Sequence, residues 1–374
     1  MYLVYANHYN IRPCKAQYLY WYLTMIEKFP NAYFVVNEDY LNPDPNRWEL
    51  KHKKEINPAW KFKLPNKLSV LKKPEEWNEL RELENPAEIL RACTKQVIPS
   101  IYTSLSKILK GNNITAALTQ CNNWTLKKVC NDFNIPVIHN EQGPLRPPYF
   151  KHTEYVDFSG VNGDTEFYDR FLNFKKIVNK VKVYPREDLL KVIAEPEQYS
   201  YIKNLSKLKP QYKCGVALQV DVDTNMIAYN EGWTSADAIN KAMKKYGQVL
   251  IRNHPSSSMQ FAVAKSLGNG VIDKSKNSLE FISKCEKILT INSSVGFEAL
   301  LLGKEVEILG DNPFAQIPKM NNEDKILALN FAIFSYLMPR KYWGNNEYYN
   351  FRINEKNEEI LYNKGQKLVM ENRE

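Results

Sequence analysis

Short apolar runs alternate with helix-like stretches along this chain of 374 residues, and this alternation limits its fold more than any other feature. Near the N-terminus the run MYLVYA is followed by an amphipathic stretch over residues 15–29 and then by AYFVVNE. Strands joined through helices of this length pair in parallel. A second series begins near Lys213, with KCGVALQV, QVLIR, KILTIN and EVEIL as its strands. The sequence therefore predicts an α/β protein with two parallel, doubly wound domains in tandem.

The stretch between the two series sets the expected domain boundaries. It is mostly polar and helix-like, and the chain after Asn354 is charged and helix-like again. We therefore expect an N-terminal Rossmann-like domain over residues 1–208 and a C-terminal one over 209–340. A helical segment over 341–374 is expected to pack back toward the N-terminal domain. Two Rossmann-like domains facing a central cleft form the GT-B-like architecture.

Composition excludes several other classes of protein. No run of eighteen apolar residues occurs, and the N-terminus lacks the pattern of a secretion signal, so we expect a cytoplasmic location. The six cysteines form no CxxC pair and no metal-type spacing. This scatter predicts reduced thiols and no structural metal.

Basic residues are concentrated in the N-terminal third of the chain. The 51 Lys and Arg exceed the 42 Asp and Glu, which gives a net charge of +9, and lysine clusters lie within residues 51–73. They fall in a stretch rich in Pro, Asn and Trp, residues 41–85, which has no clean period and is expected to be an excursion on the surface. A solvated face explains each cluster taken singly. Together they permit contact with an anionic membrane; no nucleic-acid module is present, so nucleic acid is not an expected partner.

The loop HNEQGPLRPPYF follows the strand-like PVIH, where parallel sheets place their ligands. Glu141 stands at the end of this strand, and Gly143 allows a sharp turn beside it. Arg146 offers a forked cation for a substrate carboxylate. A turn or helix-capping glutamate is the simpler explanation of Glu141 taken alone.

A second polar stretch, LQVDVDTN, follows the strand-like KCGVA. Gln219, Asp221 and Asp223 are spaced by two residues, so their side chains share one face of an extended backbone. Asp223 is followed by Thr and Asn and also fits a turn at a strand end. Asp221 lies nearer the strand and is the stronger catalytic candidate.

Two further stretches combine a strand end with a helix start. LIRNHPSSS carries Arg252, His254 and Pro255 before three serines, and KILTIN is followed by Ser293, Ser294 and Gly296. Free N–H groups at a helix start attract phosphate, and an imidazole can add a donor. Simple helix capping is the alternative for the serines. Glu298 is expected to be partly exposed on the second helix.

These four stretches, in this order, resemble those of the bacterial capsule and O-antigen β-Kdo glycosyltransferases of the retaining type. The resemblance is carried by short segments in the chain, which are Glu141 with Gly143, Gln219 to Asp221, His254 with Pro255, and the run NSSVGFEAL over residues 292–300. It implies a GT-B-like fold, a CMP-Kdo donor, a lipid-linked glycan acceptor, and no metal or other cofactor. Peripheral contact with the inner face of the cytoplasmic membrane would suit such an acceptor.

The resemblance also implies roles for individual residues. Asp221 would be the nucleophile that forms a glycosyl-enzyme adduct, although Asp223 could occupy the same position, and Glu141 would be the acid/base. His254 would stabilise the departing CMP and would be the third catalytic residue. The expected nucleotide-binding set is His254, Pro255, Glu280, Asn292, Ser293, Ser294 and Gly296, with Glu280 on the ribose hydroxyls. The expected substrate-binding set is Gln219, Arg146, Arg252 and Asp223.

Three other functions remain open from the sequence. A CDP-glycerol glycerophosphotransferase would use catalytic histidines, and His139 stands just before the Glu141 loop. An inverting transferase that uses CMP-sialic acid would not need Asp221 as a nucleophile. A basic nucleic-acid-binding protein would use the lysine clusters and the many aromatic side chains as a stacking surface.

Overall fold

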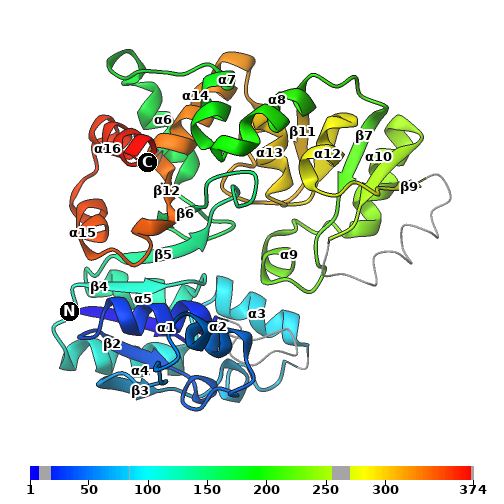
Figure 1. Ribbon diagram of the computed structural model, residues 1–374. Coiled ribbons are helices and arrows are strands. Elements are labelled where there is room, and N and C mark those ends of the chain that lie inside the picture. Colours follow the sequence, from blue (N-terminus) through cyan, green and yellow to red (C-terminus); the bar gives the residue numbers. More distant parts are fainter. Residues whose placement is uncertain (8–17, 84, 255–269, 372–374) are drawn as a thin grey trace. The chain divides into compact units, whose positions relative to one another are not determined.

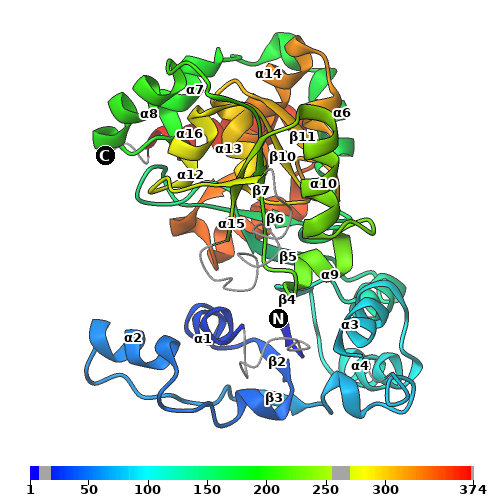
Figure 2. The ribbon, with the colours of Figure 1, turned by 90° about the vertical axis from the view of Figure 1, so that its right-hand side faces the viewer.

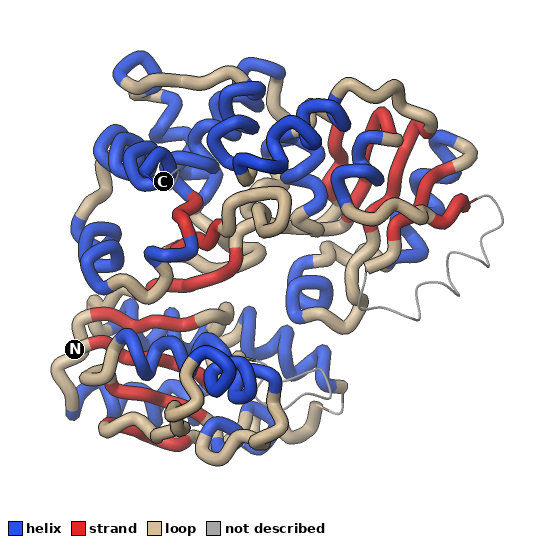
Figure 3. The backbone as a smooth tube through the Cα atoms, viewed as in Figure 1, coloured by secondary structure: helices blue, strands red, loops and turns tan. Residues whose placement is uncertain are grey.

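The computed structural model describes residues 1–7, 18–83, 85–254 and 270–371 (Figure 1). By its internal contacts the chain divides into two compact units. Unit 1 comprises residues 1–140, 157–161 and 344–353, and unit 2 comprises residues 141–156, 162–343 and 354–374. Figure 3 shows that strands and helices both contribute to each unit.

Unit 1 is built on a parallel sheet with the strand order β5-β4-β1-β2-β3. The strands are β1 (Tyr2–Ala6), β2 (Tyr33–Val36), β3 (Lys67–Val70), β4 (Ala116–Thr119) and β5 (Val137–Gln142). The helices are α1 (Leu19–Lys28), α2 (Trp48–Ile56), α3 (Pro86–Lys95), α4 (Pro99–Gly111), α5 (Trp124–Asp132) and α15 (Asn346–Asn354). At the centre of the sheet β1 lies between β2 and β4, and its Leu3 is aligned with Tyr33 of β2 and Ala117 of β4.

The two faces of this sheet are covered by different helices. Leu3 and Tyr5 point to the face where apolar side chains of α3, α4 and α5 form one buried core. Phe34 of β2 meets Tyr22 of α1, with ring centroids 5.8 Å apart. Burial on both faces explains why the strands of this sheet are almost continuously apolar in sequence.

Unit 2 contains a second parallel sheet with the strand order β11-β10-β7-β8-β9. The strands are β7 (Tyr212–Ala217), β8 (Val249–Arg252), β9 (Gly270–Ile272), β10 (Cys285–Thr290) and β11 (Glu305–Ile308). The strands β6 (Thr153–Asp157) and β12 (Leu337–Pro339) pair with each other antiparallel. The helices are α6 (Phe167–Lys175), α7 (Arg186–Ile193), α8 (Tyr199–Ser206), α9 (Thr224–Tyr229), α10 (Ser235–Tyr246), α12 (Ser278–Ser283), α13 (Val295–Leu301), α14 (Asn322–Phe331) and α16 (Glu358–Glu371).

Helices cover both faces of the second sheet (Figure 2). On one face α10 contributes Ala238 and Ile239 to a core with Val216 of β7 and Leu289 of β10. The helices α12 and α13 lie on the other face. The expected α/β class, with two Rossmann-like parallel sheets of GT-B-like type, is confirmed, whereas a cleft between the domains stays a prediction.

The helices between the two sheets belong to unit 2 by their contacts. Arg170 of α6 forms a buried ion pair with Glu358 of α16 at 2.7 Å, and Phe174 stacks on Tyr362. The contact-based division therefore leaves unit 1 at Asn140, earlier than the expected boundary at residue 208. Of the C-terminal segment, α15 lies in unit 1, where Phe29 stacks on Tyr349, and α16 lies in unit 2.

Residues 41–85 are more regular than the sequence predicts. They contain helix α2 and strand β3, which extends the sheet beside β2 from Tyr33↔Lys67 to Val36↔Val70. The stretch lies mostly at the surface, as expected, but it adds an edge strand to the sheet instead of being a mere excursion from it. The edge position of β3, with Lys67 and Val70 exposed, explains why its sequence lacks the apolar run of a central strand.

Candidate active site

Glu141 lies near the end of β5, in an environment that raises the pKa of its carboxyl group. The side chain is half-buried, and its Oε1 accepts a hydrogen bond from Gln142 N at 2.8 Å. Burial raises the pKa of Glu141 to about 7; the Gln142 amide and the charge of Arg146 oppose this shift, and the charge of Asp223 adds to it. A carboxyl group with this pKa can both accept and donate a proton at pH 7.

Gly143 fixes the path of the loop that follows Glu141. Its amide donates to Thr153 O at 2.9 Å, and a Cβ atom at this position would overlap the Thr153 side chain. The Gly143 carbonyl accepts a hydrogen bond from Arg146 Nε at 3.2 Å. The glycine is therefore required by close packing against β6, and its carbonyl orients the arginine that the sequence analysis selected.

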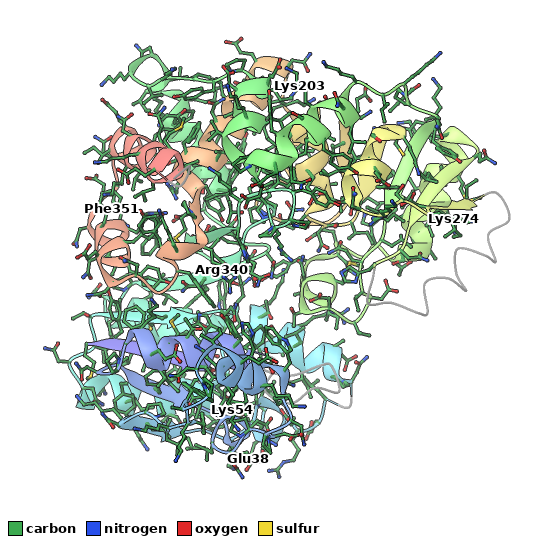
Figure 4. All side chains as sticks on the ribbon, in the orientation of Figure 1. Glu38, Lys54, Lys203, Lys274, Arg340 and Phe351 are labelled. Carbon is green, nitrogen blue, oxygen red and sulfur yellow. The ribbon has the colours of Figure 1, made fainter. Side chains whose placement is uncertain are left out.

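A hydrogen-bonded pair of Arg340 and the buried Glu154, near Glu141, was missed by the sequence analysis. Arg340 Nη1 donates to Glu154 Oε1 at 2.6 Å, and His152 Nε2 lies 3.6 Å from the same oxygen. Burial raises the pKa of Glu154 to about 8; Arg340 opposes this shift, and the charge of Glu141 adds to it. The second oxygen, Oε2, is buried without a hydrogen-bond partner. Glu154 lies on β6, and Arg340 (labelled in Figure 4) follows β12. The sequence held no signal for this pair because the two residues are 186 positions apart.

The two aspartates after β7 have different surroundings. Asp221 lies in an exposed turn, where its Oδ1 accepts a hydrogen bond from Ser235 Oγ at 2.5 Å. Asp223 is the N-cap residue of α9 and accepts a hydrogen bond from Asn225 N at 3.5 Å. Its charge also acts on Glu141. The expected turn role of Asp223 is confirmed, and in addition it lies within electrostatic reach of the candidate acid/base.

Asn292 ties the strand ends of β7 and β10 together. Its backbone amide donates to Gln219 Oε1 at 3.0 Å. Its side-chain Nδ2 donates to Asn225 Oδ1 at 3.1 Å and to Tyr229 O at 3.3 Å. Gln219 and Asn292 therefore hold the segments that follow β7 and β10 in fixed positions relative to each other.

The serines at the start of α13 are arranged differently from a simple cap. Ser293 Oγ accepts a hydrogen bond from Val295 N at 3.3 Å. Ser294 is the N-cap residue but makes no side-chain cap hydrogen bond, and it is exposed. Gly296 is buried, and a Cβ there would meet Thr290 and Ile308 at ordinary contact distance. Of this group, Ser294 is the hydroxyl that the fold leaves available.

Glu298 on α13 is a second carboxyl group that the sequence analysis did not select. Burial raises its pKa to about 7; a hydrogen bond with Ser278 and the charges of Arg146 and Arg252 oppose this shift. One carboxyl oxygen, Oε2, is buried without a hydrogen-bond partner. The expectation of partial exposure holds for the residue as a whole, but its carboxyl group is affected by the charges of two guanidinium groups.

Arg252 at the end of β8 already has a firm partner. Its Nη1 lies 2.7 Å from Asp273 Oδ2, and the Asp273 side chain is fully buried. The guanidinium also lies over the ring of Phe281, 5.9 Å from its centroid. Arg252 is therefore held in place beside Glu298 by contacts that do not need a ligand.

Glu280 is committed to contacts within the protein. It accepts hydrogen bonds from Tyr201 OH at 2.8 Å and Lys276 N at 3.0 Å, and these bonds lower its pKa. Asn277, the N-cap residue of α12, donates to Tyr201 OH at 3.0 Å and to Tyr149 OH at 2.9 Å. The loop after Glu141, which carries Tyr149, is thereby fixed to α12. A ribose contact for Glu280 stays a prediction.

His254 and Pro255 stand at the limit of what the structure describes. His254 is half-buried directly after β8. Pro255 and the serines after it lie outside the described residues, so the expected phosphate site at that helix start is untested. His139, the candidate of the histidine-based alternative, is fully buried, and its pKa is lowered to about 3 by burial and by the charge of Lys127.

Five of these side chains are connected by pairwise electrostatic interactions, with Arg146 acting on both glutamates, and all of them belong to unit 2. They are Glu141, Arg146, Asp223, Arg252 and Glu298. This group combines carboxyls that titrate near pH 7 with two guanidinium groups that can bind an anionic substrate. The arrangement is suited to transfer reactions that move a proton beside a negatively charged group.

The described residues contain no group of three or more His, Cys, Asp or Glu side chains that could hold a metal ion. The five cysteines in the described ranges, which are Cys93, Cys121, Cys130, Cys214 and Cys285, are free thiols. Cys14 lies outside those ranges. In the same part of the chain, no helix has the length and apolar character needed to cross a bilayer.

Comparison with known structures gives distant likenesses. The β-Kdo 2,7 transferase of KpsC from Thermosulfurimonas dismutans has 14% identity to this chain and a TM-score of 0.46. The match covers 90% of this chain and 92% of that chain. The β-Kdo 2,4 transferase of the same KpsC has 16% identity and a TM-score of 0.42, over 62% and 83% of the two chains. A UDP-GlcNAc 2-epimerase of Methanocaldococcus jannaschii has 13% identity and a TM-score of 0.31, over 88% and 91%. No curated protein matches the sequence.

Two protein-family models match the sequence itself, in separate parts of the chain. The N-terminal domain of the glycosyltransferase 99 family matches residues 4–166, which include the Glu141 loop. The capsule polysaccharide biosynthesis protein family matches residues 239–318, which include Arg252, Asn292 and Glu298. Together the two matches cover more than half of the chain. The N-terminal part of the chain therefore matches the glycosyltransferase 99 family and a C-terminal part matches the capsule polysaccharide biosynthesis proteins, and the chain is a glycosyltransferase related to both.

Proposed function

We propose that this enzyme transfers Kdo from CMP-Kdo to a sugar hydroxyl of a lipid-linked surface glycan, with retention of the anomeric configuration. The transferase class rests on the family, and the choice of donor rests on the resemblance of the four sequence stretches. The observation that carries the mechanism is the half-buried Glu141, whose pKa is raised to about 7 and which lies within electrostatic reach of Asp223 and Arg146.

In the proposed first step a carboxylate oxygen of Asp221 attacks the anomeric carbon of Kdo. The bond from this carbon to the phosphate oxygen breaks, and CMP leaves with the electron pair. The result is an ester between Asp221 and the sugar. The hydrogen bond from Ser235 holds the Asp221 carboxylate in one orientation. Asp223 serves as the cap of α9 and as a neighbouring charge that keeps Glu141 basic.

In the proposed second step the acceptor hydroxyl oxygen attacks the same carbon from the side that CMP has left. Its proton passes to the Glu141 carboxylate, and the ester bond to Asp221 breaks, which restores the free carboxylate. Two inversions give net retention. A pKa near 7 suits this role because Glu141 is sufficiently ionised to accept the proton and sufficiently basic to hold it.

Binding of the anionic donor is assigned to the groups around Glu298. Arg146 carries no carboxylate ion pair in the described chain, whereas Arg252 is held by Asp273, so Arg146 is proposed to meet the carboxylate of Kdo. Ser294, His254 and the amides at the start of α13 are proposed to contact the CMP phosphate, where well-placed donors stabilise developing charge by roughly 3 kcal/mol each. The reaction is proposed to take place at the cytoplasmic face of the inner membrane.

The mechanism is tested by intact-mass spectrometry of protein incubated with CMP-Kdo in the absence of acceptor. We expect the Glu141→Gln variant to accumulate a mass increase of one Kdo, which peptide mapping places on Asp221. Asp221→Asn should abolish the adduct, and the matched Asp223→Asn variant should retain it. An adduct mapped to Asp223 would transfer the nucleophile role to that residue. Absence of any adduct in Glu141→Gln would rule out double displacement.

The donor is tested separately by thermal shift with CMP, CDP, UDP and GDP. Stabilisation by CMP alone supports the CMP-sugar assignment, and preference for CDP would favour the glycerophosphotransferase alternative. The buried, low-pKa His139 gives that alternative no catalytic histidine at this position. A product of inverted configuration would instead favour a transferase of the CMP-sialic acid type.

A further inference from the structure

Helix α2 and the segment after it carry an unusual combination of exposed side chains in unit 1. Trp48 is 63% exposed, Ile56 is 70% exposed and Leu64 is 47% exposed. Four exposed lysines lie among them. We call this set the α2 surface, and its members are Trp48, Lys51, Lys54, Ile56, Lys61, Lys63 and Leu64. Lys54 is labelled in Figure 4.

Contacts with α1 hold the two parts of the α2 surface together. Glu27 of α1 accepts hydrogen bonds from Lys53 Nζ at 2.5 Å and from Trp60 Nε1 at 3.2 Å. A pocket of about 420 Å³ lies at this junction, lined by Leu23, Ile26 and Glu27 of α1 and by residues 59–63. At the other end of α2, Trp48 stacks on His52 with ring centroids 4.9 Å apart. The exposed groups therefore lie on a fixed scaffold.

The charge of the α2 surface is not compensated within the protein. Residues 48–67 contain six lysines and two glutamates. Of the two glutamates, Glu49 pairs with Arg47, and Glu55 lies 3.7 Å from His52. Within the described chain no carboxylate forms an ion pair with Lys51, Lys54, Lys61 or Lys63. A partner for this surface must therefore supply negative charge and also accept exposed apolar side chains.

An anionic bilayer meets both requirements. Tryptophan prefers the boundary between headgroups and acyl chains, and aliphatic side chains gain by entering it. Lysines near an anionic leaflet each contribute roughly 1 kcal/mol to binding. A nucleic acid would leave Ile56 and Leu64 without a stacking partner, and a second copy would bring like charges together.

We propose that the α2 surface docks unit 1 on an anionic phospholipid surface. Trp48, Ile56 and Leu64 enter the boundary between headgroups and acyl chains, and the four lysines contact the lipid phosphates. This inference goes beyond the proposed reaction, because it does not depend on which sugar is transferred.

The test is co-sedimentation of the purified full chain with vesicles of phosphatidylcholine alone and of phosphatidylcholine with phosphatidylglycerol. We expect binding to the anionic vesicles only, and weaker binding at high salt. A variant with Lys51, Lys54, Lys61 and Lys63 changed to Glu should lose roughly tenfold or more in partitioning. A charge-matched control changes Lys107, Lys209, Lys244 and Lys319 to Glu, which are exposed lysines elsewhere, and should bind as the wild type does.

A second variant, Trp48→Ser with Ile56→Ser, keeps the charge and removes apolar groups that are not part of the core. It should also lose binding, which separates docking from simple electrostatic attraction. Equal binding by the lysine variant and its control, or no binding of the wild type to anionic vesicles, would overturn the proposal. Transfer to a water-soluble acceptor should be unchanged in all these variants. If the wild type itself does not transfer to such an acceptor, the result counts against the proposed reaction and not against docking. A monomer–dimer equilibrium that only the α2 variants abolish would identify a second copy as the partner and overturn lipid docking.

Discussion

Arg340 donates to Glu154 across 2.6 Å, and this pair lies close enough to Glu141 for the two glutamates to affect each other electrostatically. The geometry is that of a strong charged hydrogen bond, yet burial keeps the pKa of Glu154 at about 8. Below that pH the pair is a guanidinium beside a protonated carboxyl, and above it the pair becomes ionic.

Arg340→Met should therefore destabilise the protein in a pH-dependent way. At pH 7 the loss of the hydrogen bond should lower the free energy of unfolding by about 1–3 kcal/mol. Above pH 8 the wild type ionises Glu154 against Arg340, whereas the variant must keep this buried group protonated in the folded state. The difference should then grow by up to about 1.4 kcal/mol per pH unit. Urea denaturation at pH 7 and pH 9 measures it, and an equal difference at both values would contradict the assigned protonation.

Glu141→Gln should lower transfer by roughly 100-fold or more, because a positioned acid/base typically contributes that much. In the wild type the rate should rise with pH to a plateau above about pH 7, since the second step needs the ionised carboxylate. The folded state holds this proton more tightly than the unfolded state does. Stability of the wild type should therefore fall between pH 4.5 and 7, and Glu141→Gln should lack that part of the fall. Rate profiles and thermal melts over this range provide the check; an unchanged rate in the variant would exclude Glu141 as the acid/base.

Gly143→Ala should cost about 1–3 kcal/mol of stability, because the added methyl group overlaps Thr153 and the backbone must shift. The shift would also displace the carbonyl that binds Arg146. Transfer should therefore fall even at temperatures well below the melting point, where the variant is folded. Gly111→Ala is the matched control, since a Cβ there meets no atom within 4 Å. Equal melting temperatures for the two variants would show that the loop tolerates the methyl group.

Ser235→Ala should slow adduct formation, because Ser235 Oγ holds Asp221 Oδ1 at 2.5 Å. We expect a fall of roughly tenfold in the single-turnover rate of sugar transfer to the protein, in line with the loss of one orienting hydrogen bond to a charged group. Donor affinity should change little. A Ser235→Thr variant, which keeps the hydroxyl, should restore the rate. If Ser235→Ala reacts as fast as the wild type, Asp221 is not positioned by this bond.

The sequence was informative where one local pattern determines the structure. The strands of both sheets are apolar because helices bury them on two faces. Polar residues that follow or end such strands, such as Glu141 and Asp221, can therefore be recognised in the sequence. β3 was missed because an edge strand with Lys67 and Val70 exposed needs no apolar run. Glu154 could not be recognised, since its partner Arg340 is 186 positions away and only the folded chain brings the two together.

Glu298 shows a different limit of sequence reasoning. Its helix is otherwise apolar, which predicts a carboxylate turned toward solvent, but the folded chain places this carboxylate near Arg146 and Arg252. Neither arginine is a neighbour in sequence, and the effect of burial on the pKa depends on atoms from several elements. Such groups become candidates only through three-dimensional electrostatics.

The hydrogen bonds of Asn292 have a mechanical consequence. One residue holds the carbonyl of Tyr229 at the end of α9 and the side chain of Asn225 at its beginning, next to the cap residue Asp223. Its own chain continues directly into Ser293 and Ser294. If a leaving group binds the serines as proposed, Asn292 connects its binding site directly to the segment that begins at Asp223.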